Sequence, residues 1–295
     1  MIIVRLQGGM GNQMFQYALG RALSIKNNTE LGLDLTFLLD RTPIPNFTFR
    51  DYNLGDFNIQ ADIVSKKDIP FLYRKYSLGI FIRYIDFIRR KFINTPGKEK
   101  KNYFFDSKIM NLGSNAYLEG WWQNQKYFLE IKDILRKDFT LKNYSEKMKQ
   151  FISKIESQNS VCVHIRRGDY LTVDTLGNKY YSVLDETYYK NALDIISKNG
   201  KIDCIYVFDR DDIDWCKQNV KFNYPTIYIE NDINLAETVT LMSACKHFIM
   251  ANSSFSWWGA WLGNAKEKVV IAPKKWLTDP SIDTSDLIPK EWIRL

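Results

Sequence analysis

The sequence predicts an α/β protein built from two Rossmann-like domains. Short apolar runs alternate with helix-like segments in both halves of the chain, an order typical of parallel sheets covered by helices. Polar or glycine-rich turns follow several of the apolar runs, where such sheets bind ligands. With 295 residues the chain is long enough for two modest domains. We expect an N-terminal domain over 1–155 and a C-terminal domain over 156–295.

The strand and helix predictions follow from apolar runs of strand length and from segments with helical periodicity. The expected strands are 2–6, 31–35, 117–122, 161–165, 204–208, 226–229, 247–251 and 269–272. The expected helices are 13–26, 186–198, 213–219, 234–244 and 257–264, and a polar helical linker is expected over 133–158.

The positive charge is concentrated in the segment 66–101. It holds eleven Lys/Arg and three acidic residues, a charge of +8, whereas the whole chain carries +7. Apolar residues within it have helical spacing: Phe81, Tyr84, Ile85, Ile88 and Phe92. A basic amphipathic helix suits an anionic membrane surface; the alternative is an ordinary amphipathic helix packed on its domain. No nucleic-acid-binding motif accompanies the charge, so nucleic acid is not an expected partner.

The cysteines and the apolar runs indicate the compartment. None of the four cysteines forms a C-x-x-C pair, and buried free thiols are the default for such residues. The first residues form a strand-like run without the pattern of a signal peptide, and no apolar run has the length of a membrane span. We expect a cytoplasmic protein, with peripheral contact at the inner membrane left open.

The run 163–170 is the most informative motif. It starts as an apolar strand and ends in a loop with His164, Arg166, Arg167 and Asp169. Arginine is always charged and its planar group matches phosphate oxygens in pairs. Two adjacent arginines at a strand end therefore indicate an anionic ligand. The alternative is a structural cluster of salt bridges.

Two further motifs join a strand to a helix. Gly9, Asn12 and Gln13 belong to a glycine-rich turn, where backbone can approach a ligand and amides suit hydroxyl groups; the alternative is a plain tight turn. The run 251–261 combines four polar residues with three tryptophans. Its hydroxyl groups suit either a helix cap or a phosphate held at the positive helix end.

An acidic run follows the strand-like segment 204–208. Asp209-Arg210-Asp211 has the D-x-D pattern that binds a metal in some glycosyltransferases, and Asp212 and Asp214 follow. Carboxylates are also favourable at the start of a helix. Since arginines can neutralise a diphosphate, we expect no metal.

The three motifs together resemble those of the family 11 glycosyltransferases, especially the bacterial α-1,2-fucosyltransferases. The resemblance covers nearly the whole chain. It is carried by the runs 8–18, 164–170 and 252–262. It implies a GT-B fold with two Rossmann-like domains facing across a cleft, and GDP-β-L-fucose as the donor. It also implies a galactose-containing acceptor glycan, inversion at the anomeric carbon, and no cofactor or required metal.

The resemblance also implies roles for particular residues. Catalytic roles fall to His164, Arg167 and Asp169, with Arg167 at the β-phosphate. Asp174, seven residues after Arg167, matches the position of an acid in related α-1,6-fucosyltransferases. The general base is therefore either Asp169 or Asp174. The remaining donor contacts implied are Arg166, Asp211, Asp212, Asn252, Ser253, Ser254, Phe255 and Ser256. The loop with Gly9, Asn12 and Gln13 is expected to face the acceptor.

One segment departs from the family pattern. The family usually has Phe-Ser-Asp-Asp-x-x-Trp, whereas this chain has the run 208–215 with Asp209 in place of the serine and one additional residue. The roles of Asp211 and Asp212 are therefore less certain than those of the arginines. Two alternatives remain: another GDP-sugar transferase or fucosyl linkage, and a GDP-sugar- or glycan-binding protein without turnover.

Overall fold

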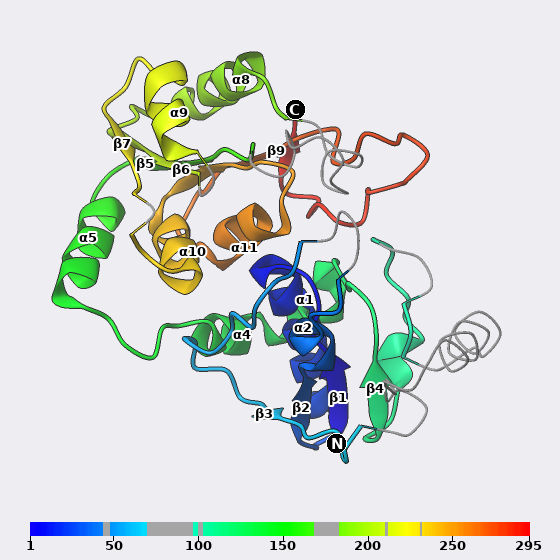
Figure 1. Ribbon diagram of the computed structural model, residues 1–295. Helices are drawn as coiled ribbons and strands as arrows, with labels where there is room; N and C mark the ends of the chain where they lie inside the picture. The colour runs from blue at the N-terminus through cyan, green and yellow to red at the C-terminus, as the bar shows by residue number, and fades with distance from the viewer. Residues whose placement is uncertain (44–47, 70–96, 100–102, 168–182, 210–211, 231) are drawn as a thin grey trace. The chain divides into compact units, whose positions relative to one another are not determined.

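The computed structural model describes residues 1–43, 48–69, 97–99, 103–167, 183–209, 212–230 and 232–295. These residues form two compact units. Unit 1 comprises Met1–Thr42, Phe49–Tyr52 and Ile59–Asp138, and unit 2 comprises Pro43–Thr48, Asn53–Asn58 and Phe139–Leu295. Each unit contains a parallel sheet with helices, so the predicted α/β class with two Rossmann-like units is confirmed (Figure 1).

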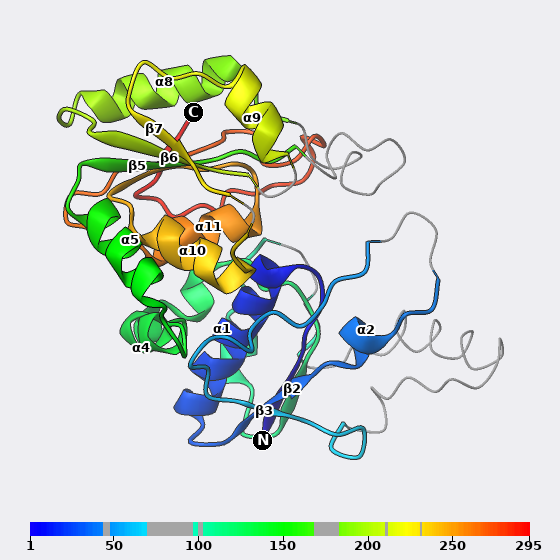
Figure 2. The ribbon, with the colours of Figure 1, turned by 60° about the vertical axis from the view of Figure 1, so that its left-hand side comes forward.

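Unit 1 contains a four-stranded parallel sheet in the order β3-β2-β1-β4. The strands are β1 (Ile2–Arg5), β2 (Leu31–Asp34), β3 (Asp62–Ile63) and β4 (Ala116–Leu118). Helix α1 (Met10–Lys26) packs along β1 and β2 (Figure 2), and α2 (Thr36–Leu39) and α4 (Lys132–Asp138) complete its helices among the described residues. The 3₁₀ turns are η2 (Ile109–Asn111), η3 (Gln125–Tyr127) and η4 (Leu129–Ile131).

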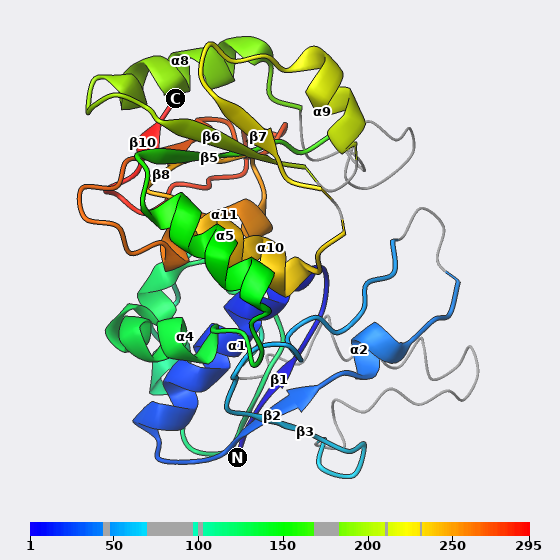
Figure 3. The same cartoon turned by 90° about the vertical axis from the view of Figure 1, so that its left-hand side faces the viewer.

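Unit 2 contains a six-stranded parallel sheet in the order β10-β9-β8-β5-β6-β7. The strands are β5 (Ser160–His164), β6 (Cys204–Phe208), β7 (Thr226–Tyr228), β8 (His247–Ile249), β9 (Val270–Ala272) and β10 (Ile293–Arg294). The helices are α5 (Glu146–Glu156), α8 (Glu186–Ser197), α9 (Ile213–Asn219), α10 (Leu235–Ala244) and α11 (Ser254–Leu262). Helices α8 and α9 lie over one face of this sheet, and α5, α10 and α11 lie over the other (Figure 3).

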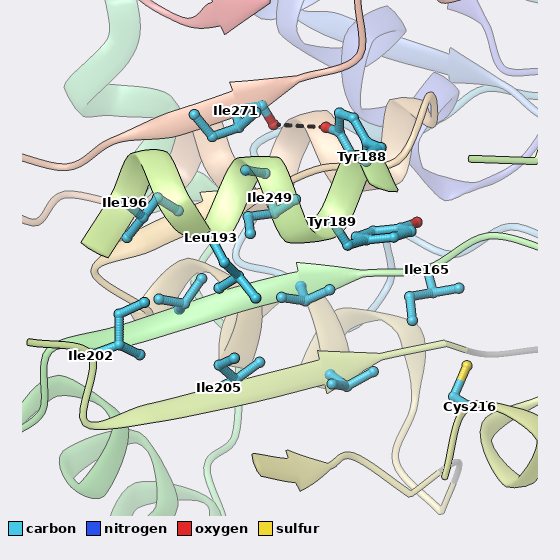
Figure 4. Close-up of a cluster of buried hydrophobic side chains, with 14 of the residues drawn as sticks. Ile165, Tyr188, Tyr189, Leu193, Ile196, Ile202, Ile205, Cys216, Ile249 and Ile271 are labelled. Carbon is cyan, nitrogen blue, oxygen red and sulfur yellow. Dashed lines mark hydrogen bonds between the residues drawn. The ribbon is translucent and has the colours of Figure 1, made fainter. Parts of the chain in front are cut away.

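The core beneath α8 and α9 is made of side chains from the central strands and these two helices. Ile205 of β6 and Ile249 of β8 are fully buried in it, beside Leu193 and Ile196 of α8 (Figure 4). Tyr188 donates its hydroxyl hydrogen bond to the backbone oxygen of Met250 at 2.7 Å, which ties α8 to the segment after β8. This core fixes the positions of the strand ends in unit 2.

Three differences from the sequence expectations have local causes. The expected strand 117–122 ends at Leu118, since Trp122 has a left-handed φ of 55° that a strand does not accommodate. The expected linker 133–158 is instead two helices, α4 and α5, and α5 packs on α10 through a buried face. Unit 1 ends at Asp138, whereas the expected boundary lies between 155 and 156, and unit 2 includes two earlier segments; the domain boundary stays a prediction.

The tryptophans of the run 251–261 belong to the core and not to a ligand surface. Trp257, Trp258 and Trp261 are at most 2% exposed. The Trp258 ring lies 5.2 Å from that of Phe139 and 5.1 Å from that of Trp257, both edge to face. Helix α11 is buried almost all round, so these rings pack in the core, and donor binding by the polar residues at its start stays a prediction.

Replacing Trp258 by alanine is expected to lower the free energy of unfolding by about 3–5 kcal/mol, because it leaves a large cavity beside two aromatic rings. Thermal or denaturant unfolding measures this loss. Ile293→Ala is the control, since Ile293 is 41% exposed and its truncation is expected to cost less than about 1 kcal/mol. Equal stabilities of Trp258→Ala and wild type would contradict the placement of α11 in the core.

Candidate active site

The sheet of unit 2 has a topological switch point between β5 and β8. The chain continues from β5 through β6 and β7 on one side, and then returns to place β8 and β9 on the other side. All these strands are parallel, with Val163 paired to Val207 of β6 and to Ile249 of β8. The segments that follow β5, β6 and β8 therefore leave the sheet at one edge. Open parallel sheets bind ligands at such a point, outside the carboxyl ends of the strands.

The Arg167 guanidinium, three residues after β5, stacks on an aromatic ring. Its Cζ lies 3.4 Å from the centroid of the Trp215 ring on α9. No carboxylate lies within ion-pair distance of Arg167 in the part of the chain that the structure describes. Its Nε is buried without a hydrogen-bond partner among these residues. A flat ring fixes the plane of the guanidinium. Contact of Arg167 and Arg166 with the donor stays a prediction.

Asp209 and Asp212 hold the turn between β6 and α9. The buried Asp209 carboxylate accepts a hydrogen bond from the Asp212 N–H at 3.0 Å and one from the Cys216 thiol at 3.5 Å. Asp212 is the N-cap of α9 and accepts from the Trp215 N–H at 3.2 Å. Both carboxylates therefore help to position the helix that carries Trp215. The predicted nucleotide contact of Asp212 stays a prediction.

His164 ends β5 as a neutral, buried imidazole. Burial and then the nearby Arg166 charge lower the pKa of His164 to about 3, so the ring is uncharged near neutral pH. Its ring centroid lies 6.1 Å from that of Phe255, and its Nδ1 has no hydrogen-bond partner within the described residues. His164 is therefore suited to hydrogen bonding at the strand end and not to carrying a positive charge.

Some of the polar residues after β8 form hydrogen bonds within the protein or are buried, and others are partly exposed. Ser253 caps α11 by accepting from the Phe255 N–H at 3.3 Å, and Asn252 is buried and donates to the backbone oxygen of Trp276 at 3.2 Å. Ser256 is buried, whereas Ser253, Ser254 and Phe255 are partly exposed. Since α11 begins at Ser254, its free N–H groups and positive end lie beside these side chains. Donor binding by this group stays a prediction.

One predicted acceptor residue of the glycine-rich turn in unit 1, Gln13, forms hydrogen bonds within the protein. The Gln13 side chain is fully buried, and its amide nitrogen donates to the backbone oxygens of Gly8 at 2.9 Å and Asp51 at 2.8 Å. Gln13 therefore holds the turn. Gly9 and Asn12 are partly exposed, and a Cβ placed at Gly9 would meet no atom within 4 Å. An acceptor contact by Gly9 and Asn12 stays a prediction.

Some predicted residues lie outside the described part of the chain. These are Asp169, Asp174, Asp211 and most of the basic segment 66–101, so their roles, and contact of that segment with an anionic membrane, stay predictions. Among the described residues no helix is long and apolar enough to span a bilayer, and no group of three or more His, Cys, Asp or Glu side chains is arranged to hold a metal.

Trp215 was not predicted as a partner of Arg167. The two residues are 48 positions apart and their contact depends on the neighbouring ends of β5 and β6. The signal was present in the family pattern, whose Phe-Ser-Asp-Asp-x-x-Trp ends at the position of Trp215.

Comparison with known proteins gives relatives over the full length. The family model for Glycosyl transferase family 11 matches residues 1–295. An α-1,2-colitosyltransferase of Escherichia coli is 35% identical, over 100% of this chain and 98% of that protein. The O-antigen biosynthesis glycosyltransferase WbnK of Escherichia coli is 32% identical, over 98% of this chain and 99% of that protein. The galactoside α-(1,2)-fucosyltransferase 1 of Mus musculus is 27% identical, over 49% of this chain and 41% of that protein.

Solved structures give weaker likenesses. The ADP-heptose heptosyltransferase II of Escherichia coli matches with a TM-score of 0.46 and 11% identity, over 100% of this chain and 89% of that one. The NodZ α-1,6-fucosyltransferase crystallised with GDP matches with a TM-score of 0.47 and 9% identity, over 92% and 94%. At these values the likeness carries no argument. The family model over the whole chain and the two full-length relatives show the family: this chain belongs to glycosyl transferase family 11.

Proposed function

We propose that the protein transfers L-fucose from GDP-β-L-fucose to the 2-hydroxyl of a galactoside, with inversion to an α-1,2 linkage, in the synthesis of a bacterial surface glycan. The observation that carries this proposal is Arg167, stacked on Trp215 beside the switch point of a family 11 chain. An oriented guanidinium without a carboxylate partner among the described residues suits the diphosphate of a nucleotide sugar. The names of the relatives support the linkage, since two of the three curated relatives described above specify α-1,2 transfer.

The proposed chemistry is a single displacement at the anomeric carbon. As the bond to GDP breaks, negative charge grows on the leaving phosphate, and Arg167 and Arg166 stabilise it where it develops. A charge-assisted hydrogen bond contributes about 1.5–3 kcal/mol. The acceptor 2-hydroxyl attacks from the opposite face and loses its proton to a base. We assign this base to Asp174 or Asp169.

A second donor is favoured by one comparison. The relative that is 35% identical over the whole chain is named a colitosyltransferase, and colitose is fucose without its 3-hydroxyl group. A donor panel separates the candidates: the purified protein is given a galactoside with GDP-fucose, GDP-colitose or GDP-mannose. We expect the highest kcat/KM with GDP-fucose. A higher kcat/KM with GDP-colitose would support the proposed α-1,2 transfer but with colitose as the transferred sugar. Transfer from GDP-mannose alone would contradict the proposal.

Transfer is expected to survive an excess of EDTA. In the described residues, Asp209 and Asp212 of the acidic run are engaged in hydrogen bonds that hold α9, and arginine supplies the charge that a diphosphate-bound cation would otherwise supply. The rate of fucose transfer before and after exhaustive chelation measures this. Complete loss of transfer, restored by Mn²⁺, would show that the run 209–211 binds a metal with the donor.

A further inference from the structure

The sheet of unit 1 has its own switch point, between β1 and β4. The chain runs from β1 to β2 and β3 on one side, and then returns to place β4 on the other side of β1. These strands are parallel, with Val4 paired to Leu118, so the turns that follow them leave the sheet at the same edge. The rule that marks the ligand site of unit 2 therefore marks a second ligand position here.

An aromatic ring and two amide side chains meet at this position. Gly8 has a left-handed φ of 73°, and a Cβ built on it would lie 2.8 Å from Cζ3 of Trp121 and 2.7 Å from Nδ2 of Asn12. The Gln123 side chain donates a hydrogen bond to Oδ1 of Asn12. The turn after β4 thus supplies Trp121 and Gln123, and the start of α1 supplies Asn12. Trp121 and Asn12 are partly exposed.

The backbone that carries Trp121 is held in an uncommon conformation. Trp122 is fully buried with a φ of 55°, a left-handed conformation that is uncommon for residues other than glycine. The Glu99 carboxylate accepts hydrogen bonds from the N–H groups of Trp121 at 2.6 Å and Trp122 at 3.2 Å. Burial raises the pKa of Glu99 to about 7. The partly buried Glu99 carboxylate thus holds the backbone of the turn that carries Trp121.

The charge at this position differs from that in unit 2. Arg5, the last residue of β1, forms an ion pair with Glu119 at 2.9 Å and donates to Oε1 of Gln7 at 3.1 Å. Its charge is therefore neutralised, in contrast to that of Arg167. Amides beside an aromatic ring suit an uncharged ligand with hydroxyl groups and apolar C–H faces, and not a diphosphate.

We propose that Trp121, Asn12 and Gln123 form a hexose subsite, and that Trp121 is the platform for the galactosyl unit of the acceptor. The assignment of that hexose to the acceptor rests on the proposed function. Ring stacking on Trp121 supplies contact area, and the partly exposed Asn12 amide, held by the buried Gln123, supplies hydrogen bonds to sugar hydroxyls. Glu99 is a positioning residue that acts through the Trp121 backbone.

Kinetics with a galactoside test the subsite. Trp121→Ala is expected to raise the KM for lactose by about tenfold or more, a loss of about 1.4 kcal/mol, while the Kd for GDP stays within about twofold of wild type. Trp121→Phe keeps a ring and is expected to restore most of the affinity. Phe105→Ala is the matched control, because Phe105 is a partly exposed aromatic of the same unit that packs on Tyr127. A wild-type KM for lactose in Trp121→Ala would overturn the subsite.

Saturation-transfer NMR with lactose and no donor separates the subsite from the proposed reaction. We expect saturation of the galactose ring protons by the wild-type protein and its loss in Trp121→Ala, with GDP binding as the check of folding. Lactose binding that depends on Trp121, in a protein that transfers no fucose, would contradict the reaction and keep the subsite. Equal saturation by wild type and Trp121→Ala would overturn the subsite whether or not fucose is transferred.

Discussion

Replacing Arg167 by alanine is expected to lower kcat/KM for fucose transfer by about 100- to 1,000-fold, because the leaving diphosphate loses a preorganised charge. GDP affinity should fall by about tenfold or more, since a charge-assisted contact of about 1.5–3 kcal/mol is removed. The fold should persist, because Arg167 lies in a loop and is only partly buried. Steady-state kinetics, calorimetric titration with GDP and thermal unfolding measure the three quantities.

Three variants distinguish the effect of the positive charge of Arg167 from the effect of its stacking on Trp215. Arg294→Ala is the control, since it removes an exposed arginine of the same unit that donates to the backbone oxygen of Lys274; its kcat/KM should match wild type. Arg167→Lys keeps the charge but loses the planar stack on Trp215, and should restore only part of the activity. Trp215→Ala keeps Arg167 and removes the ring, and should cost about 2- to 30-fold, the range of a cation–π contact. Near-normal turnover in Arg167→Ala would contradict the site.

Replacing Asp174 by asparagine is expected to lower kcat by about 10²–10⁴-fold if Asp174 is the general base. GDP affinity should change little, because asparagine has the same size and the arginines remain. Slow hydrolysis of GDP-fucose should persist, since attack by water depends less on this carboxylate than attack by a positioned sugar hydroxyl. Transfer and hydrolysis rates, measured on the same preparation, give the comparison.

Asp169→Asn is the matched variant for the other candidate base. Asp169 lies two residues after Arg167, so its replacement should also change GDP affinity through the neighbouring charge. Equal kcat for Asp174→Asn and wild type would reject Asp174 and leave Asp169, or a reaction without a protein base. Loss of kcat in Asp174→Asn together with a large loss of GDP affinity would indicate a donor contact in place of a base.

Most strands of unit 2 could be predicted because they are short apolar runs, and β5, β6, β8 and β9 are buried along their whole length. The strand 204–208 and the helix 213–219 were predicted at their observed bounds. The two-residue strands β3 and β10 were missed, because so short a pairing has no periodicity in the sequence. The order of the strands, and thus both switch points, is a property of tertiary packing that alternation of elements alone does not specify.

Site residues could be predicted where they belong to a sequence motif. They could not be predicted where their positions depend on tertiary packing. The arginine loop was recognised from its charge and its place after a strand. The core positions of Trp257 and Trp258 were not predicted, because aromatic residues suit both a core and a ligand surface. The turn at Trp121 and Trp122 depends on Glu99, which lies more than twenty residues earlier, so no local pattern predicts it.

The linkage of the product tests the central proposal most directly. The purified protein is incubated with GDP-β-L-fucose and a panel of galactosides that includes lactose, and the product is isolated and characterised by NMR. The proposal predicts an α-configured fucosyl residue whose anomeric proton correlates with C2 of galactose. A fucosyl group on another hydroxyl, or GDP-fucose that binds but is neither transferred to any galactoside nor hydrolysed, would contradict it.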